Sequence, residues 1–177
     1  MRHGIVYVAE DRKNALFYDK SIGFNIRASL LGNVGRGRSR MPERKAKSLA
    51  ASLFARLAVK APSMELPARS LSGGNQQKLL FARAASTQPK VMILDEPTHG
   101  VDIGSRAETH DFIRQLAADG VAVWVISSEL DEIVAVATRV VVVRDGTIQA
   151  EIASGEDPTQ ILAAALGVQA TKTQENR

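Results

Sequence analysis

Several kinds of residue are missing or scarce in this chain of 177 residues. It has no cysteine, which excludes a disulfide framework and a metal site built from thiolates. Aromatic residues make up only 5% of it, which weakens an interpretation as a protein that stacks single-stranded bases. No apolar run approaches the roughly 20 residues that span a bilayer, and the N-terminal apolar stretch ends in charges, unlike a signal peptide. These absences predict a soluble or peripheral protein.

The net charge of +4 is spread unevenly along the chain. Residues 1 to 60 hold 13 Lys and Arg against 4 Asp and Glu, whereas the remaining residues hold 10 against 15. Nucleic acid, an anionic membrane surface, an acidic partner and an ordinary solvated face are all compatible with the basic part. With 45% hydrophobic residues, the chain is long enough to bury one sizeable core.

Apolar periodicity predicts alternating strands and helices. We expect strands at 5–8, 91–94, 121–126, 140–143 and 147–152, and helices at 21–31, 43–59, 75–87, 104–118, 130–137 and 160–166. Asp102 is placed to cap the helix from 104, Gly120 to close it, and Arg144-Asp145-Gly146 to form a hairpin turn. The alternation from residue 91 onward is typical of an α/β fold with a parallel sheet covered by helices. The mostly helical segment 21–70 looks like an insertion.

Two adjacent carboxylates follow the apolar strand in VMILDEP. Asp95 and Glu96 emerge at its carboxyl end, where ligand sites of α/β proteins lie, and Pro97 cannot continue the strand. In nucleotide hydrolases an aspartate at such a position binds Mg²⁺, and a neighbouring acid activates the attacking water. An ordinary acidic turn would show the same pattern, so this motif alone decides nothing.

A second motif, LSGGNQQK, places two glycines directly before a helix. The N-terminus of a helix is a favourable site for an anion. Ser72 adds a hydroxyl donor there, and Asn75 and Gln76 add amides. The alternative is a plain glycine turn in which Ser72 caps the helix.

Together and in this order, the two motifs resemble those of the ABC ATPase family. LSGG followed by an amide resembles its signature loop, LDEP its second nucleotide-site motif, and Thr98-His99-Gly100-Val101-Asp102 its D-loop. The resemblance extends from Gly4 to about Ile152. It implies a P-loop NTPase fold of the RecA-like kind with an inserted α-helical sub-domain.

The resemblance also implies roles for individual residues. Asp95 would help to bind Mg²⁺, and Glu96 would act as the general base. The residues that would contact the γ-phosphate of ATP held by a partner domain are Ser72, Gly73, Gly74 and Asn75, with Gln76 beside them. Asp102 would lie at the dimer seam, and Glu10, where the family usually has glutamine, would touch Mg²⁺ or the attacking water. Residues 11–25 would face a membrane domain.

The particular sequences of four motifs point to a subfamily: EDRK, LSGGNQQK, DEPTHGVDIGS and SSELDE. As a set they resemble the second, C-terminal nucleotide-binding domain of the tandem ATPases of bacterial monosaccharide importers. Ser128 stands where most ABC ATPases have a histidine that contacts the γ-phosphate, which implies slower hydrolysis at this domain's own carboxylates. His99 and Ala9 replace the arginine and proline usual in the resembled domain, which leaves the substrate assignment weaker than the family assignment.

One motif of the family has no counterpart in these 177 residues: the phosphate-binding loop G-x-x-x-x-G-K-S/T. Residues 32–39, GNVGRGRS, imitate its spacing but carry arginine for lysine and follow a helical pattern, so we expect a basic connection there. We therefore expect a chain truncated at its N-terminus, with apolar faces of 91–94 and 121–126 left exposed and with marginal stability or aggregation. The expected divisions are a core strand with the Q-loop region (1–20), a helical sub-domain ending in the signature helix (21–88), the RecA-like core (89–152) and a C-terminal helix and tail (153–177).

The expected function is that of the ATP-hydrolysing part of a sugar importer, with ATP and Mg²⁺ as cofactors. The resemblance implies a second nucleotide-binding domain, a membrane permease and, indirectly, a sugar-binding protein as partners, and no nucleic acid. It places the chain peripherally at the cytoplasmic face of the bacterial inner membrane. A soluble ABC-type ATPase acting on ribosomes or DNA, and a non-catalytic remnant, are the alternatives.

Overall fold

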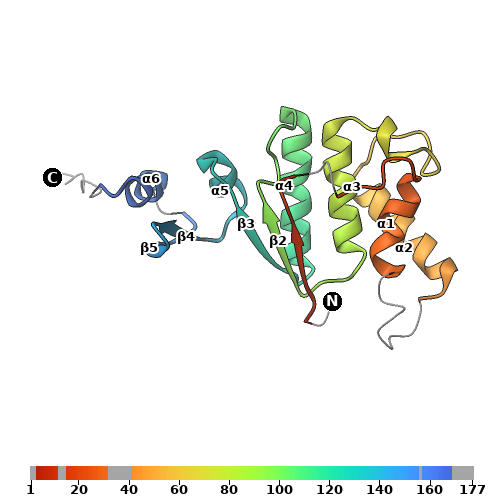
Figure 1. Ribbon diagram of the computed structural model, residues 1–177. Coiled ribbons are helices and arrows are strands. Elements are labelled where there is room, and N and C mark those ends of the chain that lie inside the picture. Colours follow the sequence, from red (N-terminus) through yellow and green to blue (C-terminus); the bar gives the residue numbers. More distant parts are fainter. Residues whose placement is uncertain (1–2, 12–14, 32–40, 156, 169–177) are drawn as a thin grey trace. The chain divides into compact units, whose positions relative to one another are not determined.

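The computed structural model describes residues 3–11, 15–31, 41–155 and 157–168, which belong to two compact units, residues 1–126 and 127–177. The first unit contains β1 (Ile5–Val8), α1 (Ile22–Leu31), α2 (Glu43–Arg56), a 3-10 helix (Ala68–Ser70), α3 (Gly73–Ala85), β2 (Val91–Asp95), α4 (Ile103–Ala118) and β3 (Ala122–Ile126) (Figure 1). The second contains α5 (Leu130–Val136), β4 (Arg139–Arg144), β5 (Thr147–Ala153) and α6 (Pro158–Leu166).

The first unit is built on a three-stranded parallel sheet in the order β1-β2-β3. The expected parallel sheet is thereby confirmed. In the second unit β4 pairs antiparallel with β5, as the predicted hairpin turn between them requires. Asp145 and Gly146 both have positive φ, 51° and 74°, which is the geometry of a tight hairpin turn that returns the chain directly beside β4.

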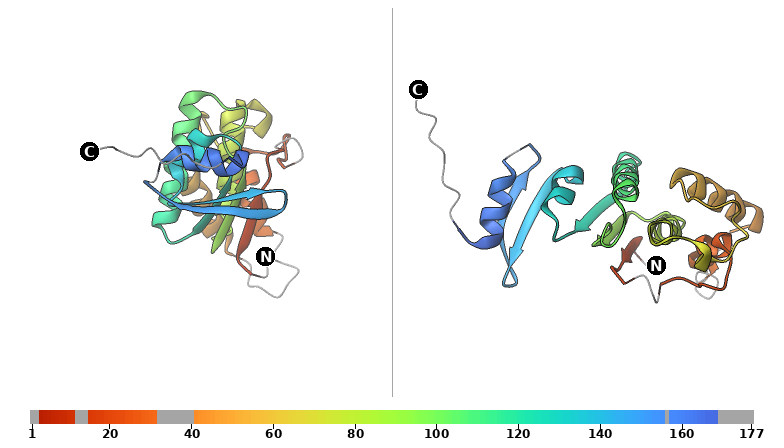
Figure 2. Two further views of the ribbon diagram at one scale, coloured as in Figure 1. Left: turned by 90° about the vertical axis from the view of Figure 1, so that its left-hand side faces the viewer. Right: turned by 90° about the horizontal axis from the view of Figure 1, so that it is seen from above.

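The two faces of the parallel sheet differ in what covers them. On one face α3 contacts β1, α4 contacts β3, and the two helices contact each other (Figure 2). Val6, Val8, Met92 and Leu94 are buried there. Successive side chains of a strand point to opposite faces, so the other residues of the same strands point away from these helices.

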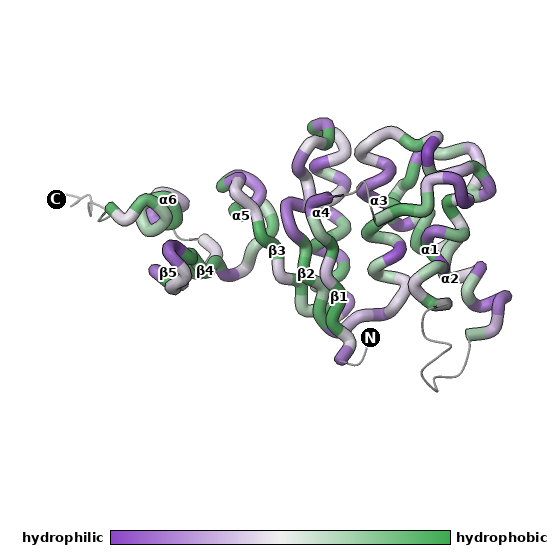
Figure 3. The backbone as a smooth tube through the Cα atoms, in the orientation of Figure 1, coloured by the Kyte–Doolittle hydropathy of each residue, from purple (hydrophilic) through white to green (hydrophobic). Residues whose placement is uncertain are grey.

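The opposite face of the sheet is apolar and exposed. The exposed fractions of Ile5, Tyr7, Trp124 and Ile126 are 49%, 57%, 62% and 44%. In Figure 3 the backbone of these strands is coloured mainly as hydrophobic. The expected exposure of apolar faces is therefore confirmed for one face only. Residues 5–8 form a strand, as expected, but only its alternate residues Val6 and Val8 are buried against the helices.

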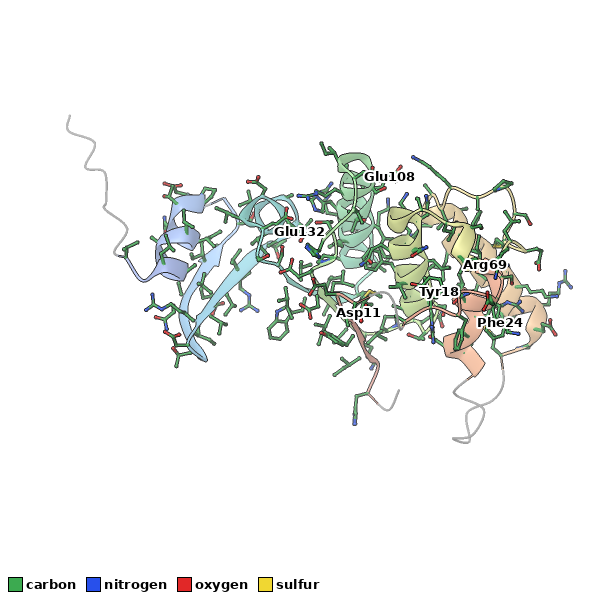
Figure 4. All side chains as sticks on the ribbon, turned by 45° about the horizontal axis from the view of Figure 1, so that its top comes forward. Asp11, Tyr18, Phe24, Arg69, Glu108 and Glu132 are labelled. Atoms are coloured by element: carbon green, nitrogen blue, oxygen red, sulfur yellow. The ribbon has the colours of Figure 1, made fainter. Side chains whose placement is uncertain are left out.

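The helical part of the first unit packs around α3, which contacts α1 and α2. Asn25 of α1 is fully buried and holds the preceding loop by both ends of its amide: Oδ1 accepts from the Phe17 N–H at 2.8 Å, and Nδ2 donates to the Phe17 carbonyl at 3.0 Å. Tyr18, Phe24 and Arg69 lie near one another beside this loop (Figure 4), and the Arg69 N–H donates to the Tyr18 carbonyl at 3.1 Å.

Most expected elements are present with shifted ends. The helix expected from residue 75 begins two residues earlier, at Gly73, so both glycines belong to its first turn. The helix expected to reach residue 59 ends at Arg56, and Ala58 adopts a positive φ of 45° that the helix cannot continue. The basic stretch 32–39 and the tail 169–177 fall outside the described residues. Within the described part, no helix is both long and apolar enough to cross a membrane.

Candidate functional site

The adjacent carboxylates lie at the carboxyl end of β2, as the sequence predicts. Asp95 is the last residue of the strand and pairs with Ile126 of β3. Its Oδ2 accepts a hydrogen bond from the Tyr7 hydroxyl on β1. This hydrogen bond raises the pKa of Tyr7 above its ordinary value, which keeps the phenol protonated and a donor to the carboxylate.

Glu96 has a backbone conformation that side chains rarely adopt. Its φ is +46°, in the left-handed region. Its N–H donates to the Ile126 carbonyl at 2.8 Å, and its carbonyl accepts from the His99 N–H at 3.2 Å. These two bonds hold the turn just after the strand, and such strain held by its surroundings is common at functional sites.

Glu10 and the loop after β2 come together. Nδ1 of His99 lies 3.0 Å from Oε1 of Glu10, and both side chains are exposed. The contact joins the loop that follows β1 to the loop that follows Glu96. The structure thus brings three residues to the carboxyl edge of β1 and β2: Glu10, Asp95 and Glu96.

The signature loop is held by its own amide side chain. Asn75 is buried, and its Oδ1 accepts from the Lys60 N–H at 2.7 Å while its Nδ2 donates to Oγ of Ser72 at 2.9 Å. Ser72 stands at the N-cap position of α3 but makes no side-chain cap bond, and it is exposed. One amide hydrogen of Gln76 turns back to the Leu71 carbonyl at 2.9 Å. Ser72 is therefore the side chain of this loop that presents a hydroxyl to solvent.

Gly74 brings the signature loop against the start of α4. A β-carbon at Gly74 would lie 2.5 Å from Oγ of Ser105 and 3.4 Å from Oδ2 of Asp102. Asp102 caps α4, as predicted: it accepts from the Ser105 N–H at 3.0 Å and from the Ser105 hydroxyl at 2.8 Å. These bonds, the backbone bond first, lower the pKa of Asp102. Two motifs far apart in the sequence therefore meet at Gly74.

Ser128 is the one expected site residue outside the first unit. It lies two residues after the end of β3 and belongs to the second unit, which begins at Ser127, whereas Asp95 and Glu96 belong to the first. The neighbouring Ser127 hydroxyl oxygen accepts from the Glu129 N–H at 3.1 Å.

Sequence reasoning missed three groups that hold the site. Tyr7 binds Asp95, Ser105 packs against Gly74, and Lys78 of α3 is buried beside Glu108 of α4. Only Lys78 left a sequence signal: it is a charge directly before LLFARAA, in which six of the seven residues are apolar. Within the described residues, no group of three or more His, Asp or Glu side chains is arranged to hold a metal ion. The oxygen donors of Asp95 are nevertheless of the kind Mg²⁺ prefers, and Mg²⁺ is usually held by one or two carboxylates together with phosphates and water.

Comparison with solved structures supports the fold. A dimeric ATP-binding cassette bound to ADP and phosphate superposes with a TM-score of 0.72 at 21% identity, over 86% of this chain and 63% of that one. A nucleotide-free ATP-binding cassette from an ABC transporter gives 0.73 at 23% identity, over 90% of this chain and 65% of that one. These similarities show an α/β fold of the expected class.

Curated relatives are more similar in sequence. A ribose import ATP-binding protein of Agrobacterium fabrum is 47% identical over 90% of this chain and 32% of its own length. One of Burkholderia ambifaria is 44% identical over 97% of this chain and 33% of its own length. The chain thus spans about a third of the length of these relatives. The family model described as ABC transporter matches residues 1–99, more than half of the sequence. The resemblance expected from the motifs is therefore confirmed, and the chain belongs to the ABC transporter family.

Proposed function

We propose that this chain supplies part of the nucleotide-binding domain of an ATPase that drives the import of a simple sugar. The support is the family membership together with relatives that are named ribose import ATP-binding proteins. In this role Asp95 helps to bind Mg²⁺, and Glu96 is the general base that activates water. Ser72 and the first turn of α3, Gly73 and Gly74, receive the γ-phosphate of ATP bound by a partner domain.

The observation that carries the proposal is the geometry of the two carboxylates. They leave the carboxyl edge of a parallel sheet, where ligands of α/β proteins bind. Glu96 is held at φ +46° by a bond from its N–H to the end of β3 and by a bond within its own turn, and this left-handed conformation breaks the strand between the two carboxylates. One carboxylate can then face a metal while the other faces water. Bound Mg²⁺ would neutralise charge on the phosphate oxygens.

The proposal includes partners that complete the site. The 177 residues contain no G-x-x-x-x-G-K-S/T loop, so the β-phosphate of ATP has to be held by residues other than these. A second nucleotide-binding domain, a membrane permease and, through it, a sugar-binding protein fit this role, at the cytoplasmic face of the inner membrane. Ser128 replaces an imidazole with a shorter hydroxyl, which predicts slow hydrolysis at the half-site of Asp95 and Glu96.

Replacing the general base tests the assignment. In the complete protein, assembled with its partner subunits, Glu96→Gln keeps the size of the side chain but removes the base. ATP turnover at the half-site of Asp95 and Glu96 should fall by about a hundredfold or more, whereas ATP binding should persist. Turnover is measured by phosphate release and binding by a fluorescent ATP analogue.

Glu65→Gln is the matched control, because Glu65 is exposed and lies away from the sheet edge. It should leave both turnover and binding unchanged. If Glu96→Gln turns over ATP as fast as Glu65→Gln does, Glu96 is not the base.

A further inference from the structure

A buried charge in α3 lies outside the residues assigned so far. The side chain of Lys78 is only 2% exposed, and its ammonium forms an ion pair with the Glu108 carboxylate of α4, the helix on which Figure 4 marks Glu108. The same ammonium donates to the Ala58 carbonyl at 3.2 Å. A buried charge is costly unless it is paired and hydrogen-bonded, so the burial of Lys78 depends on these contacts.

The contacts of Lys78 reach the segment that leaves α2. Ala58 follows the end of α2 with a φ of +45°, and two residues later the Lys60 N–H donates to Oδ1 of Asn75 at 2.7 Å. Asn75 and Lys78 are three residues apart on one face of α3. Residues 58–60 are therefore fastened to α3 at two points, once by the lysine ammonium and once by the asparagine amide.

The bond from Lys60 decides how the amide of Asn75 is turned. An N–H can only donate, so the atom that faces the Lys60 N–H is the amide oxygen, and the amide nitrogen faces Ser72. Oγ of Ser72 accepts from this nitrogen at 2.9 Å. The hydroxyl hydrogen of Ser72 then remains available as a donor to an anion.

We propose that Lys78 is a positioning residue for the signature loop: through Ala58 and the Lys60 backbone it fixes the Asn75 amide, and so turns the Ser72 hydroxyl outward as a donor. The inference rests on the proposed function of Ser72. Glu108 takes part because it pairs with Lys78 and with Lys60, whose Nζ lies 3.6 Å from Oε1 of Glu108. The pairing also ties the signature helix to α4, which Asp102 caps.

The test compares Lys78→Met with Lys78→Arg in the complete assembled protein. Lys78→Met keeps the length of the side chain and removes the charge, whereas Lys78→Arg keeps a donor for both Glu108 and Ala58. We expect kcat/KM for ATP to fall by about tenfold in Lys78→Met, because small misplacements of a positioning group cost this much or more, and to recover largely in Lys78→Arg. Amide hydrogen exchange across residues 71–76 should be faster in Lys78→Met. Lys47→Met, which removes an exposed lysine of α2, should change neither quantity.

A double-mutant cycle with Ser72→Ala separates positioning from general packing. If Lys78 acts through Ser72, Lys78→Met should lower kcat/KM much less in the Ser72→Ala background than in the native one. Equal losses in both backgrounds would overturn the inference, as would a Lys78→Met protein that matches Lys47→Met in activity and exchange. If Ser72→Ala alone keeps full turnover, the proposed function of the loop fails instead.

Glu108→Gln replaces Lys78→Met in this test if the Lys78→Met protein does not fold, as judged by the loss of a cooperative thermal transition. It keeps a hydrogen-bond acceptor for Lys78 but removes the carboxylate charge. Faster exchange at residues 71–76 together with a lower kcat/KM is expected, and native values of both would overturn the inference.

Discussion

At the scale of single residues, the candidate site depends on two positions that are sterically restricted, one in its backbone conformation and the other in the size of its side chain. Glu96 is held in the left-handed region, and Gly74 lies so close to Ser105 that no side chain fits between them. Both positions lie inside the motifs that carry the family resemblance. Local sterics account for the glycine at position 74, whereas a glutamate at position 96 is kept in spite of its backbone conformation, as is common at functional sites.

Gly74→Ala should destabilise the protein. Its new β-carbon would lie 2.5 Å from Oγ and 2.9 Å from Cβ of Ser105, so α3 or α4 has to move. Overpacking of this kind typically costs about 1–3 kcal/mol. Urea denaturation followed by circular dichroism measures the loss.

Gly23→Ala provides the comparison for the same chemical change. Gly23 also lies in a helix, α1, but the nearest atoms to its new β-carbon are 3.6 Å away, an ordinary contact. Alanine is favoured over glycine inside a helix by about 0.5–1 kcal/mol, so this variant should be as stable as the native chain or slightly more so. Equal losses in the two variants would contradict the packing of Gly74 on Ser105.

At the scale of elements, two helices begin at aspartates that cap them. Asp102 caps α4 through the Ser105 N–H, and Asp157 caps α6 through the Thr159 N–H. Hydrogen bonds from the cap partners lower the pKa of each carboxyl, for Asp157 chiefly those from Thr159. The two caps therefore make the N-termini of α4 and α6 sensitive to acid. Within α4, the pKa of Glu108 is lowered as well, by its hydrogen bond with Lys78.

The free energy of unfolding should fall in acid partly because of Asp102. A pKa that is lower in the folded state than in the unfolded state gives stability that is present above the unfolded value, 3.8, and is lost as the pH falls through the folded value. Asp102→Asn keeps a capping oxygen but does not titrate, so its stability should decline less between neutral pH and pH of about 3. Denaturation at a series of pH values checks this.

Asp145→Asn is the control for the loss of one titrating aspartate. Asp145 is an exposed turn residue with a side chain that is 91% accessible. Its acid-induced decline should match that of the native chain. An identical decline in Asp102→Asn would show that the cap of α4 does not contribute to acid sensitivity.

At the scale of the whole molecule, one face of the parallel sheet is not covered by the described helices of the first unit. The first unit buries alternate residues of its strands under α3 and α4 and leaves Tyr7, Trp124 and Ile126 exposed on the other side. A contiguous apolar face of this kind favours association or aggregation.

The isolated 177-residue chain should self-associate through this face. Trp124→Lys places a charge on this face at a residue that is 62% exposed, and should shift the chain toward monomer, as measured by light scattering over a range of concentrations. Ile148→Lys makes the same kind of change at a 70% exposed residue of β5, outside the face, and should leave association unchanged. A native chain that is monomeric at every concentration and melts in one cooperative transition would contradict the prediction.

Much of the fold could be predicted from the chain alone. The apolar strands ending in Asp95 and Ile126, the capped helix from Asp102 and the hairpin turn at Asp145-Gly146 depend on periodicity and turn chemistry within a few residues. The order of the strands in the parallel sheet, β1-β2-β3, could not be predicted in this way. Pairing of parallel strands joins residues that lie far apart in the chain, and no local pattern specifies which strands become neighbours.

The sequence by itself determined which chemistry is present and in which order, because the motifs around Ser72 and Asp95 are contiguous and their residue types are specific. Tertiary structure alone decided which groups hold those motifs. Tyr7 meets Asp95, Glu10 meets His99, and Lys78 meets Glu108 only after the strands and helices have packed. Such contacts join residues that are distant in the chain, and their geometry depends on register and helix rotation, which no local pattern records.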